Sequence, residues 1–453
     1  MRAISPSVVS LVLAALTLAG CAATPGIVGS GKAPAASASA VTLAAPVSAG
    51  SAKGPLTIES AAQRAVAWHP SVREAAAKVN QQKAGIDEAR AGYGPTLGWD
   101  VGTSYVNGGG NQPAVNLTGS QTLLDFGKTD GKVRVATAGT DRSRAELLLT
   151  VDQVAFETAT ALLEVQRNRR LLEIAKQRVA DTEAIRNLVS NRTKAGAGTQ
   201  SDMLQAEARL EAARTAAIEI ETQLVRWENA ALSLTGTAPP LRITGGTPAW
   251  MNGSCPAGSP SDAPAVSEAE ARLALATAEY ERLMAETAPS VKLEGSVGGT
   301  FDALRDADPD YRIGLKVGGN LYDGGATAAR LEAAKHAADA SKAGVALAKL
   351  EAQRGVAEAG ALLGSYKRLQ GTLARSLDAL DQTRTLYRSQ YGQLGTRTLL
   401  DVLNAEDEYH LARLDEAGIG FDIKKLSLGC VQSSGKMREV LGLTGKSVQG
   451  VPL

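Results

Sequence analysis

The sequence is poor in the residues that build thick globular cores and reactive centres. Only 4% of its 453 residues are aromatic, and it has three histidines and three cysteines. Ala, Gly, Leu and charged residues dominate, a composition that favours long helices with thin cores. His69, His336 and His410 stand far apart without metal-ligand spacing, and the sequence has no nucleophile elbow or phosphate loop. We therefore expect no enzyme, no metal and no cofactor.

An excess of one charge sign is also lacking. The chain has 48 basic and 47 acidic residues, a net charge of +1, and no basic block of the kind that neutralises phosphates. This balance excludes nucleic acid as an expected partner.

Long apolar runs are missing as well, because the run Val8 to Leu18 is too short to span a bilayer as a stable helix. With Arg2 before it and small residues after it, this run predicts a signal peptide over residues 1–20. The segment Leu18-Ala19-Gly20-Cys21 resembles the lipobox of bacterial lipoproteins, which implies an N-terminal lipid on Cys21, and Ala22 in place of Asp implies outer-membrane sorting. The alternative is an ordinary cleavable signal peptide.

Export places the remaining cysteines, Cys255 and Cys430, in an oxidising compartment, where they can form a disulfide.

Two stretches rich in small residues, Gly and Pro interrupt the mature chain. Residues 21–55 predict a flexible tether, residues 236–266 a linker, and residues 444–453 a C-terminal tail.

Between these breaks the chain repeats itself. The segment "LLDFGKTDGKVRVA" from Leu123 resembles "LYDGGATAARLEAA" from Leu321, and "GAGTQSDMLQAE" from Gly196 resembles "GTRTLLDVLNAE" from Gly395. The offsets are 321 − 123 = 198 and 395 − 196 = 199. Two landmarks at nearly one offset indicate an internal duplication, with repeats at 56–235 and 267–443.

Each repeat contains a very long helical segment. Thr140 to Ala195 has neither Gly nor Pro, so it can form one helix of 56 residues, about 84 Å long. Apolar and small residues then recur at steps of three and four on both sides of the break at 194–200, which predicts an antiparallel coiled-coil hairpin. Gly196 and Gly198 supply the left-handed residue that such a tip requires. By repeat symmetry Gly392 and Gly395 end the second pair, with its tip at 392–398. We expect the interior glycines of the second pair to mark close helix contacts.

Before each hairpin the period changes from helix to strand. Apolar residues alternate with polar or small residues, which predicts strands at about 95–106, 114–124, 289–301 and 310–322. Each is near the length that crosses a bilayer at a tilt, with lipid on one face and water on the other. The alternative is two half-buried hairpins of a soluble sheet. Because four strands cannot close a barrel, membrane insertion requires oligomerisation.

The two repeats, their strand pairs and their long hairpins together resemble the TolC family of outer-membrane efflux and secretion channels. Specific matches are "AVAWHPSVREA" from Ala65, "LLDFGK" from Leu123 and the tip "GTRTLLDVLNAE". The resemblance covers about Leu56 to Leu443. It implies a mainly helical fold with transmembrane β-structure, in which four strands per chain contribute to a twelve-stranded trimeric barrel that a helical tunnel continues into the periplasm.

The resemblance also implies roles for residues at the tips. Asp401 matches a pore-narrowing Asp of the family, Arg397 matches an Arg that holds the gate shut, and Ser201 and Asp202 match its partners. A second gate Asp falls on Asn404, and the family's gate Tyr has no clean match, because Tyr391 is one residue out of step. Gly196, Gly198, Gly395 and Thr396 are expected at the tips that contact an adaptor. Helix capping is the alternative role for Asp202 and Asp401.

Members of this family are passive ducts that work with a periplasmic adaptor and an inner-membrane ABC or RND transporter. The tip motif is more similar to members that serve type I protein secretion, and the lipobox to dedicated drug-efflux members. The resemblance therefore implies a cargo of drugs, other small molecules or a secreted polypeptide. The alternative function is that of a periplasmic adaptor lipoprotein. Such an adaptor normally has one helical hairpin, whereas this sequence predicts two.

Overall fold

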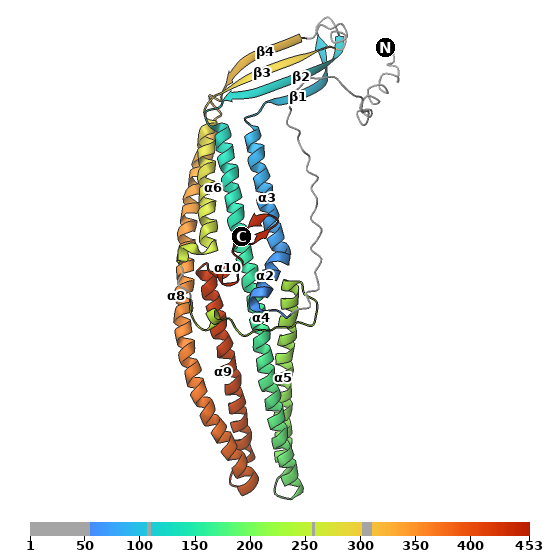
Figure 1. Ribbon diagram of the computed structural model, residues 1–453, viewed down its shortest axis with the longest axis vertical. Helices are drawn as coiled ribbons and strands as arrows, with labels where there is room; N and C mark the ends of the chain where they lie inside the picture. The colour runs from blue at the N-terminus through green and yellow to red at the C-terminus, as the bar shows by residue number, and fades with distance from the viewer. Residues whose placement is uncertain (1–54, 107–109, 256–258, 301–309) are drawn as a thin grey trace, which may run out of the picture. The chain divides into compact units, whose positions relative to one another are not determined.

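The computed structural model describes residues 55–106, 110–255, 259–300 and 310–453 (Figure 1). The predicted signal peptide, Cys21 and nearly all of the predicted tether lie outside these residues, as do parts of both strand-connecting loops. The described residues belong to one compact unit. In this unit the same run of elements occurs twice, namely a helix, two strands and a long helical hairpin.

The first run comprises α3 (Pro70–Ala91), β1 (Thr96–Val106), β2 (Gly110–Leu124), α4 (Lys128–Lys194) and α5 (Gln200–Thr235), after the short helix α2 (Ile58–Trp68). The second comprises α6 (Pro264–Glu286), β3 (Ser290–Thr300), β4 (Asp310–Gly318), α8 (Ala326–Ser389) and α9 (Leu399–Ser433). Strands β1 and β3 lie within one residue of their predicted ranges at both ends. Strand β2 ends where predicted, at Leu124, but begins four residues earlier, at Gly110. Strand β4 ends four residues before the predicted position 322.

The helix α4 is longer than the Gly- and Pro-free segment that predicted it. It has 67 residues, about 100 Å at 1.5 Å per residue, and it begins at Lys128 and runs through Gly131 and Gly139. A single glycine costs a helix only about 1 kcal/mol, so packing along the rest of its length can override two of them. The side chain of Asp125 fixes the start, since it accepts hydrogen bonds from the backbone N–H groups of Gly127 and Thr129 at 3.1 and 2.7 Å.

The same capping begins the second long helix. Asp323, 198 residues after Asp125, accepts hydrogen bonds from the backbone N–H and the hydroxyl of Thr327 at 2.9 and 2.6 Å. The helix α8 then continues for 64 residues. The prediction that its interior glycines mark close helix contacts is largely wrong within this chain. A Cβ added at Gly355 would lie 2.8 Å from Ser433 Oγ, but a Cβ added at Gly344 or Gly360 would meet no atom within 4 Å.

A π-helical turn, Gln390–Leu394, ends the second long helix. Such a turn takes up one residue more than an α-turn. It therefore accounts for the change of repeat offset from 198 to 199 and for Tyr391 standing one residue out of step. Gly392 lies in this turn and not in a left-handed conformation. The left-handed residues of the two tips are Gly196 (φ +77°) and Gly395 (φ +64°).

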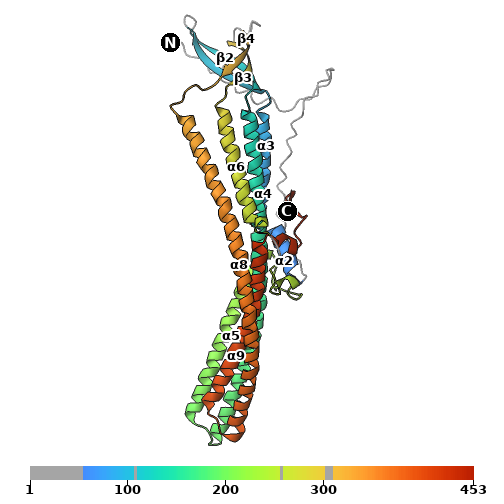
Figure 2. The same cartoon turned by 90° about the vertical axis from the view of Figure 1, so that its left-hand side faces the viewer.

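The four strands form one antiparallel sheet in the order β1-β2-β3-β4, so the pairing of β2 with β3 joins the two repeats. Figures 1 and 2 show α4 packed against α5, and α8 against α9, with both hairpin tips at the end of this unit away from the sheet.

The largest hydrophobic core lies where α2, α3 and the middle of α4 meet the C-terminal residues. Residues 444–453, predicted as a tail, are folded: Val448 and Val451 pair in a small antiparallel sheet and are buried in this core. Part of the predicted linker is also structured, because α6 begins at Pro264.

Candidate functional site

The sheet has one apolar face that no part of the described chain covers. Its cross-strand neighbours Trp99, Leu117, Val297 and Tyr311 form a row across all four strands. Trp99 and Tyr311, on the outer strands, are 76% and 83% exposed. A row of large apolar side chains left open to solvent is a strong sign of a lipid or protein contact.

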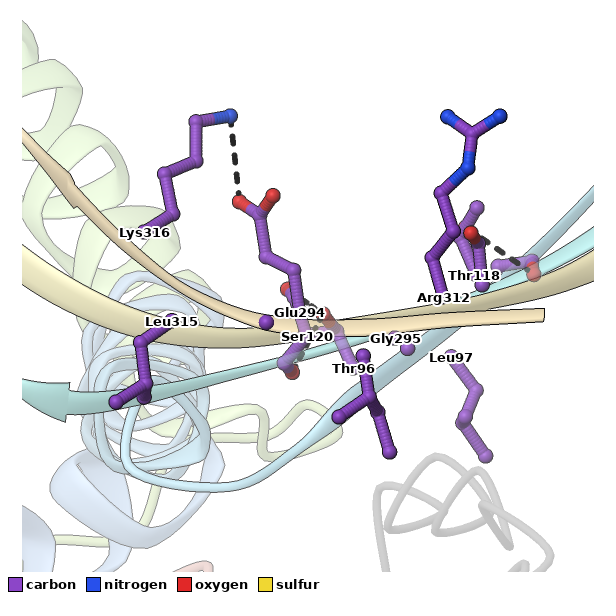
Figure 3. A pocket seen from close by; sticks show the side chains of 14 residues that line it. Thr96, Leu97, Thr118, Ser120, Glu294, Gly295, Arg312, Leu315 and Lys316 are labelled. Carbon is purple, nitrogen blue, oxygen red and sulfur yellow. Dashed lines mark hydrogen bonds and ion pairs between the residues drawn. The ribbon is translucent and has the colours of Figure 1, made fainter.

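The opposite face of the sheet is polar. Its rows pair Asp100 with Asn116, whose Nδ2 donates a hydrogen bond to Asp100 Oδ2 at 3.0 Å. Figure 3 shows Lys316, Glu294 and Arg312 on one side of the strands and Leu97 and Leu315 on the other. A hollow of about 780 Å³ lies along the sheet, and its polar lining includes Thr118, Ser120, Glu294, Ser296, Arg312 and Lys316. The sheet can therefore separate water from an apolar phase.

The two similar sequence motifs build the same cap at the two hairpin tips. The hydroxyl of Thr199 accepts a hydrogen bond from the N–H of Asp202 at 3.1 Å, and the carboxylate of Asp202 accepts one from the N–H of Thr199 at 3.0 Å. Thr398 and Asp401 repeat this capping box at 3.2 and 3.3 Å. Both acidic residues thus start a helix.

Of the predicted gate residues, Arg397, Ser201, Asp202 and Asp401 make no side-chain contact with the other hairpin among the described residues. Arg397 lies with its guanidinium 4.2 Å from the ring centre of Tyr387, donates to Gln390 Oε1 at 3.1 Å and lies 3.9 Å from Asp401. Within the described chain it has no contact with Asp202, and Ser201 is exposed at the start of α5. Gly196 supplies the left-handed residue that this tip requires, and Gly198 has an ordinary φ. A Cβ there would lie 2.9 Å from Thr193 Oγ1, so close packing requires this glycine.

Asn404 belongs to a polar network that joins the two hairpins. Asp407, on the same helix, lies between two arginines of the first hairpin, 2.9 Å from Arg178 Nη2 and 3.0 Å from Arg209 Nη1. Arg209 also donates to Asn404 Oδ1 at 3.2 Å. Nearer the tips, Arg192 of α4 donates to the carbonyl of Tyr391 at 2.7 Å. The hairpins are thus tied together within one chain.

A buried ionic cluster makes a second tie between α4, α8 and α9. His410 Nε2 lies 3.1 Å from both Asp181 Oδ2 and Glu406 Oε1, and Arg384 and Arg388 approach Glu406 at 3.0 and 3.2 Å. Burial alone would raise the pKa of Glu406. The hydrogen bond from His410 and the charges of Arg388 and Arg384 outweigh burial, and the pKa lies below its ordinary value.

This cluster corrects the view of His410 as an isolated residue. Asp181, Glu406 and His410 offer three ligand atoms within 4.8 Å of one another, the kind of set that can hold a metal ion. The two arginines already balance the two carboxylates, however, so a divalent cation would add an uncompensated double charge. The donor set fits an ion-pair network better than a metal site. No sequence signal pointed to Asp181 of α4, because this residue lies in the other repeat, far from His410 along the chain.

The two cysteines of the described chain form a disulfide. Cys255 of the linker bonds to Cys430 of α9, with Cα atoms 5.4 Å apart, and Cys430 is buried in a small core with Leu363 and Ile423. The bond ties the segment between the two repeats to the second hairpin.

Among the described helices, none is both long enough and apolar enough to cross a membrane.

Comparison with known proteins adds independent information. The family described as "Outer membrane efflux protein" matches residues 61–237 and 261–420. Protein CyaE of Bordetella pertussis is 24% identical over 417 residues, which cover 84% of each chain. Outer membrane efflux protein BepC of Brucella suis is 23% identical over 429 residues, covering 90% of this chain and 91% of BepC. The outer membrane protein VceC from Vibrio cholerae shares the fold, with a TM-score of 0.74 at 19% identity over 83% of this chain and 96% of VceC.

Proposed function

Because the chain belongs to the outer membrane efflux protein family, it is a channel protein of the outer membrane and not an enzyme, and we propose that it forms the exit duct of a tripartite export system. In this role it conducts solutes passively from an inner-membrane transporter across the periplasm and the outer membrane. The family match also disfavours the alternative of a periplasmic adaptor.

The two-faced sheet carries this proposal. Strand β1 pairs only with β2, and β4 only with β3, among the described residues, so both outer strands have an open edge. In hydrocarbon the unpaired backbone groups of an open edge cost several kcal/mol each. A cylinder closed by three chains removes every edge, with the Trp99–Tyr311 row toward lipid and the Asp100–Asn116 row toward water. We therefore propose a homotrimer with twelve strands, four from each chain.

The hairpin tips are the proposed periplasmic entrance. Three Asp401 carboxylates near one axis would attract cations and hold the pore narrow, with Arg397, Ser201, Asp202 and Asn404 at its rim. The proposed adaptor contacts lie beside them at Gly196, Gly198, Gly395 and Thr396, in the turns that join the helices of each hairpin.

The proposed partners are a periplasmic adaptor and an inner-membrane ABC or RND transporter, which selects drugs, other small molecules or a secreted polypeptide as cargo. Outer-membrane lipid surrounds the sheet, and a lipid on Cys21 adds a second anchor.

Cross-linking of the open edges tests the trimer. One cysteine at Val101 or Thr103 of β1 and one at Ile313 or Leu315 of β4 should join chains in outer-membrane fractions into a ladder that ends at three. The control pair, Leu117→Cys with Val297→Cys, joins register partners of one chain and should run as a monomer. Efficient cross-linking of the control pair without any intermolecular product from the edge pairs would contradict the proposal.

A further inference from the structure

The charges on the polar face of the sheet lie in rows. Counted from the helices, the first row holds Lys292 and Lys316 beside Thr122, and the second holds Glu294 beside Ser120. The third row holds Arg312 beside Ser296. In the fourth, Asp310 and Asp100 lie at either end. Positive charge is thus concentrated where the sheet joins the helices, and negative charge lies farther along the strands.

The first row is electrostatically unfavourable within the chain. Lys292 and Lys316 are direct cross-strand partners on the same face, an arrangement that destabilises a sheet. Lys316 finds an exposed ion pair with Glu294 at 3.4 Å (Figure 3). Neither Lys292 nor Arg312 has an ion-pair partner in the part of the chain that the structure describes. The first three rows therefore carry three basic residues against one acidic residue, 3 − 1 = +2 per chain.

This geometry points to an anion-attracting surface formed by Lys292, Lys316 and Arg312, which we call the basic rows. The inference rests on the proposed function, in which the polar face lines a channel of three chains. Closure would place the basic rows and Glu294 around one axis, with a net charge of 3 × 2 = +6, at the level where the sheet meets the helical tunnel. The solutes favoured there are multiply charged anions, such as those that carry phosphate or several carboxylate groups.

The surroundings strengthen the effect of these charges. Lys316 and Arg312 border the hollow along the sheet, and their own strand is exposed along its length. Where one sign of charge predominates between low-dielectric walls, the local concentration of counter-ions rises, by about 10- to 1,000-fold when the wall carries that sign alone. The basic rows lie at the opposite end of the long helices from Asp401, so the two ends of the duct would select ions of opposite sign.

Planar-bilayer recordings of the full-length protein test this inference. In 0.1 M KCl, where the Debye length is about 10 Å, inorganic tripolyphosphate added on the sheet side should block the current. The Lys292→Gln/Lys316→Gln variant should need roughly tenfold more tripolyphosphate for the same block, and its reversal potential in a KCl gradient should move toward that of K⁺. The Lys292→Arg/Lys316→Arg variant should behave like the wild type, and so should Lys446→Gln, which removes an exposed charge far from the sheet.

The Glu294→Gln variant supplies an independent measurement, because loss of the one acidic residue in the first three rows should strengthen the block. If the double Gln variant fails to assemble, the comparison of Glu294→Gln with the wild type is sufficient to test the inference. Pores whose block and reversal potential are the same in the wild type, the double Gln variant and Glu294→Gln would overturn this inference alone. If the wild-type chain forms no pores, the proposed function is wrong and the inference falls with it.

Discussion

Asp407 of α9 lies 2.9 Å from Arg178 of α4, and this ion pair joins the two hairpins of the chain about two turns from the second tip. Both side chains are largely buried, with 16% and 13% of their surface exposed. Arg209 approaches the second oxygen of the same carboxylate at 3.0 Å. One acidic residue of the second repeat thus balances two basic residues of the first.

The Asp407→Asn variant should loosen this attachment. Removing the charge leaves the largely buried Arg178 without its ion-pair partner, and we expect the free energy of unfolding to fall by about 2–3 kcal/mol. Hydrogen exchange should show faster exchange in the first turns of α9. Asp415→Asn, an exposed acidic residue of the same helix, serves as the control and should leave exchange unchanged. Equal exchange in both variants would show that the pair does not hold the hairpins together.

The two tip motifs offer a matched comparison at their last residue. Glu406 is 2% exposed and balances Arg384 and Arg388, whereas its repeat equivalent Glu207 is exposed and lies 3.9 Å from Arg186. We expect Glu406→Gln to destabilise the protein by about 3–5 kcal/mol and Glu207→Gln by less than about 1 kcal/mol. Thermal unfolding followed by circular dichroism measures the difference.

The pH dependence of the Glu406 contribution has a definite sign. Its folded-state pKa lies below the ordinary value of 4.5, so the contribution is complete above about that pH and is lost as the pH falls through the folded-state pKa. Similar melting curves for the two variants, at any pH above 5, would exclude a special role for the buried cluster.

Asp152 should have the opposite pH dependence. It is 2% exposed in α4, and burial raises its pKa to about 6 even though Arg438 Nε lies 3.2 Å away. Between about pH 4 and 6 the folded state binds this proton more tightly than the unfolded state does. Its contribution therefore favours folding at the acidic end and falls by about 3 kcal/mol as the pH rises through about 6.

The Asp152→Asn variant removes this titration. The difference in melting temperature between the variant and the wild type should grow from pH 4.5 to pH 7.5 in favour of the variant. A constant difference across this range would contradict the assignment of the titration to Asp152.

The proposed entrance predicts a difference between two acidic residues that share the same capping geometry. Asp401→Asn should reduce block by Mg²⁺ added on the tip side, because the carboxylate ring loses its charge. Asp202→Asn alters the same kind of cap in the first hairpin and should reduce the block less. Single-channel recordings measure both variants, and unchanged Mg²⁺ block in Asp401→Asn would remove the proposed gate role.

The disulfide predicts a redox-sensitive linker. Cys255 and Cys430 are 175 residues apart in sequence, and a bond across so long a loop stabilises by about 2–5 kcal/mol. The Cys255→Ser/Cys430→Ser variant should melt at a lower temperature and should be cut by trypsin within residues 236–263. Addition of reductant to the wild type should reproduce both effects, and an unchanged cleavage pattern would show that the linker is held by other contacts.

Local patterns predicted the elements well. The alternation of side chains along Leu97, Trp99 and Val101 marks a strand because successive residues of a strand point to opposite faces. The Thr199–Asp202 and Thr398–Asp401 spacings predict helix starts, since a capping box uses residues three apart. The sequence did not show which glycine of each tip is left-handed. Gly196 and Gly395 adopt that conformation, but Gly198 and Gly392 do not.

Contacts between the repeats had no comparable signal. His410 stands alone in the sequence, and only folding brings Asp181, 229 residues earlier, to within 3.1 Å of it. The exposed Glu207 and the buried Glu406 occupy equivalent places in the repeated motif, yet only one of them meets two arginines.

The order of residues along the chain determined the long helices, their capped tips and the two-faced strands, because each depends on neighbours a few residues apart. It also determined the duplication, because the same short motifs occur twice. The tertiary structure alone decided which charges are buried, which hairpins are tied together and where basic residues of different strands form rows. Such relations depend on side chains far apart in sequence, and their energies arise only when packing removes those side chains from water or sets like charges side by side.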